Sequence, residues 1–263
     1  MINISQDTKN ILNANYLVRQ IVEDRKHFYE VTAPTNVKRF RSVTDYLSVI
    51  NKPALPAWAA RETANHIEKA LLGRLGGKES ASIILNEPWI KDVMKDGKKT
   101  PEKIKDQAAD YGTLFHKILE KIVDGEEPEI PKELNDLVSR FEGWLDETKT
   151  EFMMGEMPVA SLQYEYGGSF DAVGRRGDEI ILFDWKTSNS VYPEHALQLG
   201  AYAQALYETF GWGCDRAMIV RFSKTPPYLF EVHEVFDLER SLKAFLDAKS
   251  LKESLEKPQF LPI

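Results

Sequence analysis

The sequence predicts an α/β core that carries a mostly helical N-terminal elaboration. Three observations support this fold class. Apolar residues recur at helical spacing through most of the first 151 residues. From residue 159 onward, short runs rich in β-branched and aromatic residues are separated by glycine-containing turns, which is typical of strands. Two long amphipathic segments then alternate with further strand-like runs, so that the second half reads β-β-β-α-β-β-α.

The N-terminal half is expected to contain several helices. The first 35 residues have apolar side chains at helical spacing, namely Ile11, Leu12, Leu17, Val18, Ile21 and Val22. A second helix opens at Arg41, with Ser42 or Thr44 as its N-cap, and Pro53 and Pro56 end it. Between the later helices, residues 76–104 are expected to form a lysine-rich loop. We expect those helices at 57–72, 105–123 and 132–151.

The C-terminal half is expected to form the sheet. Two turn sequences, Gly167-Gly168 and Arg176-Gly177-Asp178, divide the first three runs into an antiparallel meander of two hairpins. We expect strands at 160–165, 169–175, 179–185, 216–222 and 228–236, and helices at 193–210 and 238–255. The 263-residue chain is long enough for one large domain or two small ones. We predict a helical elaboration over 1–110 and a compact core over 111–263.

Composition limits the chemistry that the chain can perform. The single cysteine, Cys214, excludes an intramolecular disulfide framework, a cysteine-ligated iron–sulfur cluster and a zinc ribbon within one chain. There is no secretory pattern and no apolar run long enough to span a bilayer. The sequence therefore predicts no membrane partner and a reducing location, either cytoplasmic (in a bacterial or phage-infected cell) or in the mitochondrial matrix.

The net charge of -7 argues mildly against a nucleic-acid partner. Carboxylates that hold divalent cations contribute to that sum, however, although bound metal neutralises them. Basic residues also cluster locally. Lys38, Arg39 and Arg41 form one group, and residues 91–105 contain six lysines. A solvated segment is the simpler interpretation of the second group.

The most informative residues are Asp171, Asp184 and Lys186. Asp184 and Lys186 are two apart at the end of an expected strand, so their side chains point to the same face. If the hairpin places Asp171 opposite Asp184, two carboxylates and an ammonium group converge. Such hard oxygen ligands suit Mg²⁺ or Mn²⁺, with water and substrate phosphate as further ligands. The lysine would activate the attacking water or stabilise charge in the transition state.

The Asp-x-Lys tripeptide carries little weight alone, since an edge-strand ion pair would explain it equally well. It also occurs at Asp7/Lys9, Asp24/Lys26, Asp96/Lys98 and Asp247/Lys249, with a Glu version at Glu147/Lys149. Only the copy at Asp184 follows an apolar strand and has an upstream aspartate on an adjoining strand.

Two helical pairs accompany this copy. His116 and Glu120 are four apart, and so are Gln198 and Tyr202, so each pair shares a helix face. A helical histidine is more often structural, and Tyr202 could equally pack in a core.

Four motifs in order give a more specific signal. They are Gly112-x-x-x-His116, Gly168-x-x-Asp171, Asp184-x-Lys186 and Gln198-x-x-x-Tyr202. Together they resemble the RecB-like branch of the PD-(D/E)xK nuclease superfamily, which has a restriction-endonuclease-like core with a mixed central sheet flanked by helices. The segments 42–47, 112–116 and 183–188 resemble the mitochondrial genome maintenance exonucleases and their phage and bacterial relatives.

The resemblance implies a role for each matched residue. His116, Asp171, Asp184 and the main-chain carbonyl of Trp185 would bind one or two Mg²⁺ or Mn²⁺ ions, and Lys186 would activate water. Ser42, Thr44 and Thr187 would contact substrate phosphate near the site. Gln198 and Tyr202 would position the DNA backbone or the catalytic lysine. Glu165 and Glu120 are weaker candidates for a carboxylate near the metal. The iron–sulfur staple of some relatives is excluded by the cysteine count.

The expected function is metal-dependent hydrolysis of DNA by an exonuclease. A preference for single-stranded ends follows only from the narrower resemblance, which also implies a setting in replication, recombination or repair with partner proteins. Two alternatives remain open at this point. One is a structure-specific or restriction-like endonuclease of the same fold, and the other is a catalytically silent nucleic-acid-binding module.

Overall fold

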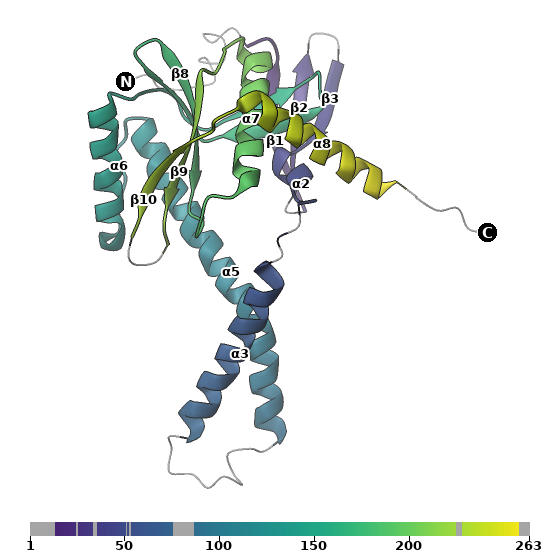
Figure 1. Cartoon of the computed structure of the whole chain (residues 1–263), viewed down its shortest axis with the longest axis vertical. Helices are drawn as coiled ribbons and strands as arrows, with labels where there is room; N and C mark the ends of the chain where they lie inside the picture. Colours follow the sequence, from purple (N-terminus) through teal and green to yellow (C-terminus); the bar gives the residue numbers. More distant parts are fainter. Residues whose placement is uncertain are drawn as a thin grey trace, which may run out of the picture. The chain divides into compact units, whose positions relative to one another are not determined.

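The computed structural model describes residues 14–24, 26–33, 36–50, 52, 54–75, 87–224 and 228–257. These residues divide into two compact units (Figure 1). One unit joins the described residues up to Ile50 with those from Leu114 onward, and the other lies within 51–113. This division differs from the expected boundary at residue 110, because the N-terminal segment packs with the core and only the helices of 51–113 form a separate unit.

The N-terminal segment forms an antiparallel sheet, and the predicted lead-in helix is wrong over its described part. The strands are β1 (Leu17–Glu23), β2 (Lys26–Ala33) and β3 (Asn36–Arg41), in that order. Residues 1–13 lie outside the described residues. Paired apolar residues such as Ile21 and Val22 fit either a helix or a strand. The strand is formed here because β-branched and aromatic residues alternate, with Val18, Tyr29 and Val31 buried against the neighbouring hairpin.

A short helix, α2 (Val43–Leu47), follows as predicted, and Ser42 caps it by accepting a hydrogen bond from the Asp45 amide at 3.0 Å. The second unit consists of α3 (Ala54–Leu75) and the first part of α5 (Glu87–Val123). Residues 87–104 are therefore helical, and the predicted loop is wrong there, while 76–86 lie outside the described residues. Lysine, glutamate and alanine favour a helix, and α5 continues through Pro101. Gly97 allows α5 to approach Ile67 of α3 closely.

The core sheet contains five strands in the order β10-β9-β8-β7-β4. Its central pair, β8 and β9, is parallel, and the remaining pairs are antiparallel, so the sheet is mixed. The predicted strands 179–185, 216–222 and 228–236 are confirmed, and β4 was not predicted. The bounds are β4 (Glu151–Met154), β7 (Ala172–Arg176), β8 (Glu179–Lys186), β9 (Arg216–Phe222) and β10 (Phe230–Glu234).

The predicted strand 169–175 is two strands in different sheets. β6 (Tyr166–Phe170) pairs with β5 (Met157–Ser161) in a separate two-stranded sheet, whereas β7 pairs with β8. The first hairpin was predicted to turn at Gly167-Gly168, and this is wrong, because the turn lies at 162–165 and both glycines are inside β6. The second hairpin is present, and the chain changes sheet at Asp171, which belongs to neither strand. Asp171 therefore lies at the junction of the two sheets.

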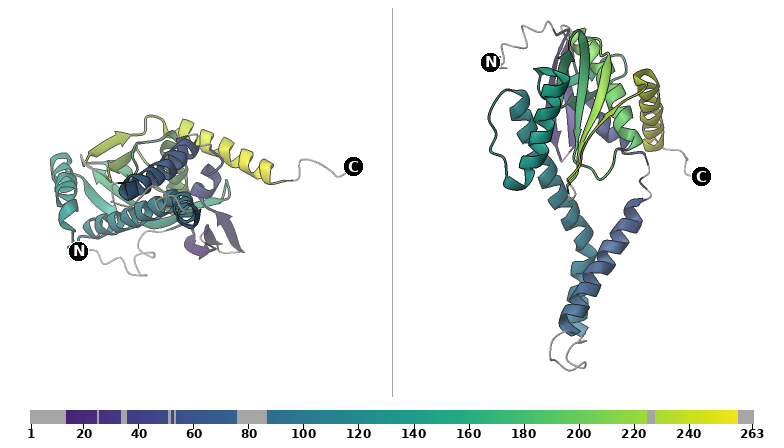
Figure 2. Two further views of the ribbon diagram at one scale, coloured as in Figure 1. Left: turned by 90° about the horizontal axis from the view of Figure 1, so that it is seen from below. Right: turned by 60° about the vertical axis from the view of Figure 1, so that its left-hand side comes forward.

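Helices cover both faces of the five-stranded sheet (Figure 2). α7 (Pro193–Phe210), which begins and ends as predicted, and α8 (Leu238–Glu256) cover one face. The end of α5 and α6 (Asn135–Thr148), preceded by a short 3-10 helix (Lys132–Leu134), cover the other. Leu182 of β8 packs in the same core cluster as Leu199 of α7, so the even-numbered side chains of β8 face α7.

An aromatic cluster fixes the opposite face of β8. Phe141 of α6 lies 5.5 Å from the ring of Trp185 and 5.8 Å from Phe222, and Phe183 stacks on Trp185. This packing restricts β8 between two layers of helices. None of the helices in the described part of the chain is long and apolar enough to cross a membrane.

Candidate active site

The side chains of Asp184 and Lys186 emerge together from the α7 face of β8. The Lys186 Nζ lies 2.5 Å from Asp184 Oδ2, and the Asp184 side chain is 3% exposed. Successive strand residues point to opposite faces of a sheet, so two side chains share a face only when they are two residues apart, as Asp184 and Lys186 are. The alternation therefore positions an ammonium group beside a buried carboxylate.

Two residues of α7 continue this arrangement. Lys186 Nζ donates a hydrogen bond to Gln198 Oε1 at 3.0 Å, and Gln198 Nε2 donates to the Tyr202 hydroxyl at 2.8 Å. Gln198 and Tyr202 are both buried and lie one helical turn apart. The tyrosine ring in turn lies against Gly168, where a Cβ would overlap it. The predicted Gln-x-x-x-Tyr pair thus holds the lysine from the side opposite Asp184.

Asp171 is opposite Asp184, as the hairpin register was expected to place it. The β7–β8 register pairs Ala172 with Phe183, and one further step brings Asp171 level with Asp184. Asp171 Oδ2 accepts a hydrogen bond from the Trp185 amide at 2.7 Å, and its Oδ1 is 3.1 Å from His116 Nδ1. Asp171 therefore joins His116 of α5 to β8, and Lys186 joins β8 to α7.

Burial raises the pKa of Asp184 to about 6, with a further contribution from the charge of Asp171, while the Lys186 ammonium acts in the opposite direction. Burial would lower the pKa of His116, but the hydrogen bond and negative charge of Asp171 outweigh it, so the pKa of His116 is raised. The cluster therefore concentrates negative charge that a cation would neutralise.

Glu156 is a further carboxylate that the sequence motifs did not identify. It lies between β4 and β5 at an exposed position, yet its pKa is raised. Partial loss of hydration is the largest cause, followed by the charges of Asp171 and Glu120. The candidate residue Glu120 is therefore close to this carboxylate, one turn along α5 from His116. A glutamate in a loop between two short strands has no spacing rule that would have distinguished it.

Ser42, Thr44 and Thr187 are not joined to the cluster by any hydrogen bond in the described structure. The Ser42 hydroxyl is buried and serves as the N-cap of α2. Thr44 is exposed and contacts that hydroxyl at 3.1 Å. Thr187 directly follows Lys186 at the end of β8. Ser42 is nevertheless bridged to Gly167, one residue from the glycine that supports Tyr202.

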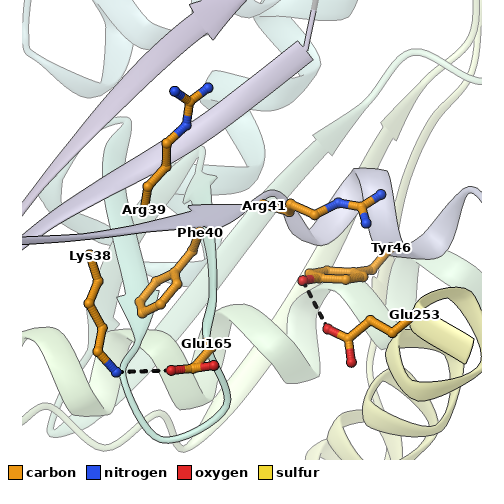
Figure 3. Close-up of a pocket in the computed structure, with 7 residues that line it drawn as sticks. All are labelled: Lys38, Arg39, Phe40, Arg41, Tyr46, Glu165 and Glu253. Carbon is orange, nitrogen blue, oxygen red and sulfur yellow. Dashed lines mark hydrogen bonds and ion pairs between the residues drawn. The ribbon is translucent and has the colours of Figure 1, made fainter. Parts of the chain in front are cut away.

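Glu165 is not brought to the cluster. It lies in the β5–β6 turn, with a left-handed backbone (φ 55°), and its carboxylate pairs with Lys38 Nζ at 2.9 Å (Figure 3). The five residues of β6 separate it from Asp171, so the two Cα atoms are about 20 Å apart. Glu165 instead lines a pocket of about 420 Å³ together with Lys38, Arg39, Phe40, Arg41, Tyr46 and Glu253. The structure therefore does not bring Glu165 to the cluster with which its predicted role was associated.

The Asp171–Asp184 pair fits a divalent cation. Asp184 Oδ2 is buried and has no hydrogen-bond partner of acceptable geometry, although Lys186 contacts it. This carboxylate oxygen can also be a ligand for a cation. Within the described ranges, no three His, Cys, Asp or Glu side chains are grouped as a preformed metal site. Mg²⁺ does not need such a cage, because one or two carboxylates with water and substrate phosphate suffice.

Comparison with known proteins gives a family and weak structural similarities. No curated protein matches the sequence significantly. Among solved structures, the chain is similar to SSO0001 (14% identity, TM-score 0.32, covering 75% of this chain and 89% of that chain). It is also similar to the alkaline exonuclease LHK-Exo from Laribacter hongkongensis (18% identity, TM-score 0.27, 56% and 82% covered). The complex of LHK-Exo with dAMP is similar at 15% identity (TM-score 0.28, 75% and 94% covered).

The family assignment comes from the sequence match. Residues 93–260 match the model of the PD-(D/E)XK nuclease superfamily, which is well over half of the chain. The matched region contains His116, Asp171, Asp184, Lys186 and Gln198, which the mixed sheet brings together as described above. The chain therefore belongs to the PD-(D/E)XK nuclease superfamily.

Proposed function

We propose that this chain is a metal-dependent DNA exonuclease that hydrolyses phosphodiester bonds at single-stranded ends. The observation that carries the proposal is the placement of Lys186 between Asp184 and Gln198, with Asp171 opposite Asp184. A structural ion pair would need only the lysine and one carboxylate. The second carboxylate, that of Asp171, goes beyond that need.

Asp171, Asp184 and the Trp185 carbonyl would hold Mg²⁺ or Mn²⁺, with His116 as a further ligand. The bound cation supplies Lewis-acid activation of water and neutralises the phosphate charge. His116 Nδ1 contacts Asp171 Oδ1 in the present arrangement, so the histidine also orients that carboxylate. A nitrogen ligand in the set favours a contribution from Mn²⁺.

Lys186 would orient the attacking water and stabilise negative charge on the phosphate. An ammonium group has three N–H donors. One points to Asp184 and one to Gln198, which leaves one for a water molecule or a phosphate oxygen. Because Gln198 and Tyr202 are buried and hydrogen-bonded to each other, they hold the ammonium group at a fixed position before substrate arrives.

DNA ends as the substrate are supported by the sequence resemblance to the mitochondrial genome maintenance exonucleases. The second unit adds a physical argument, since the side chains of all six lysines in 91–105 are exposed on α5. Exposed lysines attract a phosphate backbone. A role in replication, recombination or repair follows from the same resemblance.

The test compares cleavage of 5′- and 3′-labelled single- and double-stranded oligonucleotides with that of a covalently closed single-stranded circle, with Mg²⁺, with Mn²⁺ and with EDTA. We expect metal-dependent release of small products from free single-stranded ends and no cleavage of the circle. A linearised circle would instead indicate an endonuclease. No cleavage under any condition would leave only a nucleic-acid-binding role.

Matched variants test whether activity depends on the Asp-x-Lys sequence at the candidate site rather than on any Asp-x-Lys sequence in the chain. Lys186→Ala and Asp184→Asn should abolish cleavage. Asp247→Asn and Lys249→Ala alter another Asp-x-Lys sequence, on α8, where Asp247 pairs with Lys243 and Lys249 with Glu253. These controls should keep the activity of the unaltered protein. Full activity in Lys186→Ala would contradict the assignment.

A further inference from the structure

Tyr29 connects the N-terminal sheet to the region beside the active site. Its ring lies against Gly167, where a Cβ would overlap it. The adjacent Gly168 supports the ring of Tyr202 in the same way. Since neighbouring strand residues face opposite sides, β6 separates two tyrosines, one from β2 and one from α7. Tyr202 is connected to Lys186 through Gln198, whereas the Tyr29 hydroxyl contacts Ser169.

The hydroxyl of Tyr29 is 3.3 Å from Ser169 Oγ and accepts a hydrogen bond from Gln20 Nε2, also at 3.3 Å. An amide nitrogen can only donate, so Tyr29 is the acceptor in that bond and its own proton is free to point to Ser169. Burial raises the pKa of Tyr29 above its usual value, and the phenol therefore stays protonated. These contacts allow donation in the order Gln20 to Tyr29 to Ser169.

This order leaves the Ser169 proton available. No second partner for the Ser169 hydroxyl is present among the residues that the structure describes. The serine is half-buried, so it is accessible from solvent. When the Ser169 oxygen accepts from Tyr29, the serine proton can be donated to a phosphate oxygen.

Ser169 also lies next to the carboxylate cluster. It precedes Asp171 by two residues, so their Cα atoms are about 7 Å apart. Glu156 gives an independent indication of the same proximity, because its charge acts on Tyr29 on one side and on Asp171 and His116 on the other. Consecutive phosphates of a DNA strand are separated by a similar distance, so a strand with one phosphate at Asp171 would place its neighbour near Ser169.

We propose that Ser169 binds a backbone phosphate adjacent to the one being cleaved, and that Tyr29 is the residue that positions its hydroxyl. The assignment rests on the proposed nuclease function and extends its substrate site to the β1–β3 sheet. Ser169 contacts the substrate, whereas Tyr29 acts only through Ser169. Because the contact forms before and during the reaction alike, it contributes to substrate binding rather than to the chemical step.

The experiment measures kcat and KM on a labelled single-stranded oligonucleotide, and binding of the same oligonucleotide by fluorescence anisotropy in EDTA. Ser169→Ala should raise KM and Kd about tenfold, the effect of a lost hydrogen bond to a charged group, with kcat almost unchanged. Ser169→Thr keeps the hydroxyl and should restore most of the affinity. Tyr29→Phe should weaken binding less, and the double variant should equal Ser169→Ala alone.

Tyr16→Phe is the matched control. Tyr16 is a buried tyrosine in the same core cluster as Tyr29, but its hydroxyl donates to the Ala160 carbonyl at 2.6 Å. This variant should leave KM unchanged. If the unaltered protein cleaves DNA, and the KM values of Ser169→Ala and Tyr29→Phe equal that of Tyr16→Phe, the assignment of Ser169 is wrong while the proposed nuclease function stands. If the unaltered protein does not cleave, the proposed function fails. If Ser169→Ala does not fold, the comparison of the KM values of Tyr29→Phe and Tyr16→Phe tests the assignment: a higher KM for Tyr29→Phe supports it, and equal values contradict it.

Discussion

The ring of Tyr202 lies directly against Gly168, at a distance that excludes any side chain on the glycine. Tyr202 accepts a hydrogen bond from Gln198, and Gln198 accepts one from Lys186. A glycine on β6 therefore determines the position of the lysine on β8. This contact connects the Gly-x-x-Asp and Gln-x-x-x-Tyr motifs, although they belong to different elements.

Replacing Gly168 with alanine is predicted to lower kcat more than tenfold and to destabilise the fold by about 1–3 kcal/mol, because the added methyl group overlaps the Tyr202 ring. Cleavage rates and thermal unfolding measure the two effects. Gly143→Ala is the control. Gly143 is in α6 with no atom within 4 Å of an added Cβ, so this variant should be slightly more stable and fully active. Normal activity in Gly168→Ala would show that the tyrosine does not act through the lysine.

Gln198→Ala is predicted to lower kcat by about ten- to a hundredfold with little change in KM, since it frees an ammonium group that acts in the transition state. Steady-state kinetics on a single-stranded oligonucleotide measure this. Gln204→Ala alters another glutamine of α7, which bonds Glu208 at 2.9 Å, and should keep kcat. Equal kcat values for the two variants would contradict the role of Gln198.

Asp184→Asn is predicted to stabilise the metal-free protein at pH 8. Burial raises the pKa of Asp184 from 3.8 to about 6 in the folded state. Between these values the folded state binds more protons than the unfolded state, so the free energy of unfolding falls as the pH rises from 4 to 6. Above pH 6 the ionised carboxylate costs on the order of 3 kcal/mol.

Urea unfolding in EDTA at pH 4 and pH 8 tests this difference. The variant should exceed the unaltered protein in stability at pH 8 and match it near pH 4. Asp146→Asn, at an exposed position of α6, should show no such pH-dependent gain. A variant that is no more stable than the unaltered protein at pH 8 would show that Asp184 is not held ionised in a desolvated site.

Metal-dependent activity should fall as the pH drops below 6, because protonated Asp184 loses its affinity for a cation.

Glu156→Gln is predicted to raise the Mg²⁺ concentration for half-maximal activity severalfold. The charge of Glu156 adds to those of Asp171 and Glu120, so its removal weakens the attraction for a cation. A metal titration of cleavage measures the shift, and Glu129→Gln, at an exposed position after α5, is the control. An unchanged titration curve would limit Glu156 to a structural role.

The sequence alone was sufficient for the family and for much of the core. Asp184 and Lys186 could be assigned to one strand face because strand side chains alternate with a period of two. The sequence suggested a hairpin between these residues, but the register that brings Asp171 opposite Asp184 was only a condition until the structure gave it. α7 was predicted to the residue, since its proline start and glycine end are local signals.

Other features depended on contacts between distant segments. Residues 17–33 have apolar spacing that fits a helix, and they form strands because Tyr29 and Val31 pack on the β5–β6 hairpin.

The local sequence suggested one strand over 169–175, but the chain changes sheets at Asp171, where hydrogen bonds from His116 and Trp185 hold the carboxylate. Glu156 and Ser169 likewise had no motif to mark them. The sequence by itself thus determined which residues are the candidates for the chemistry, because local periodicity sets the face on which each side chain lies. Only the tertiary structure decided which other polar groups surround them, since those groups come from segments whose proximity depends on packing.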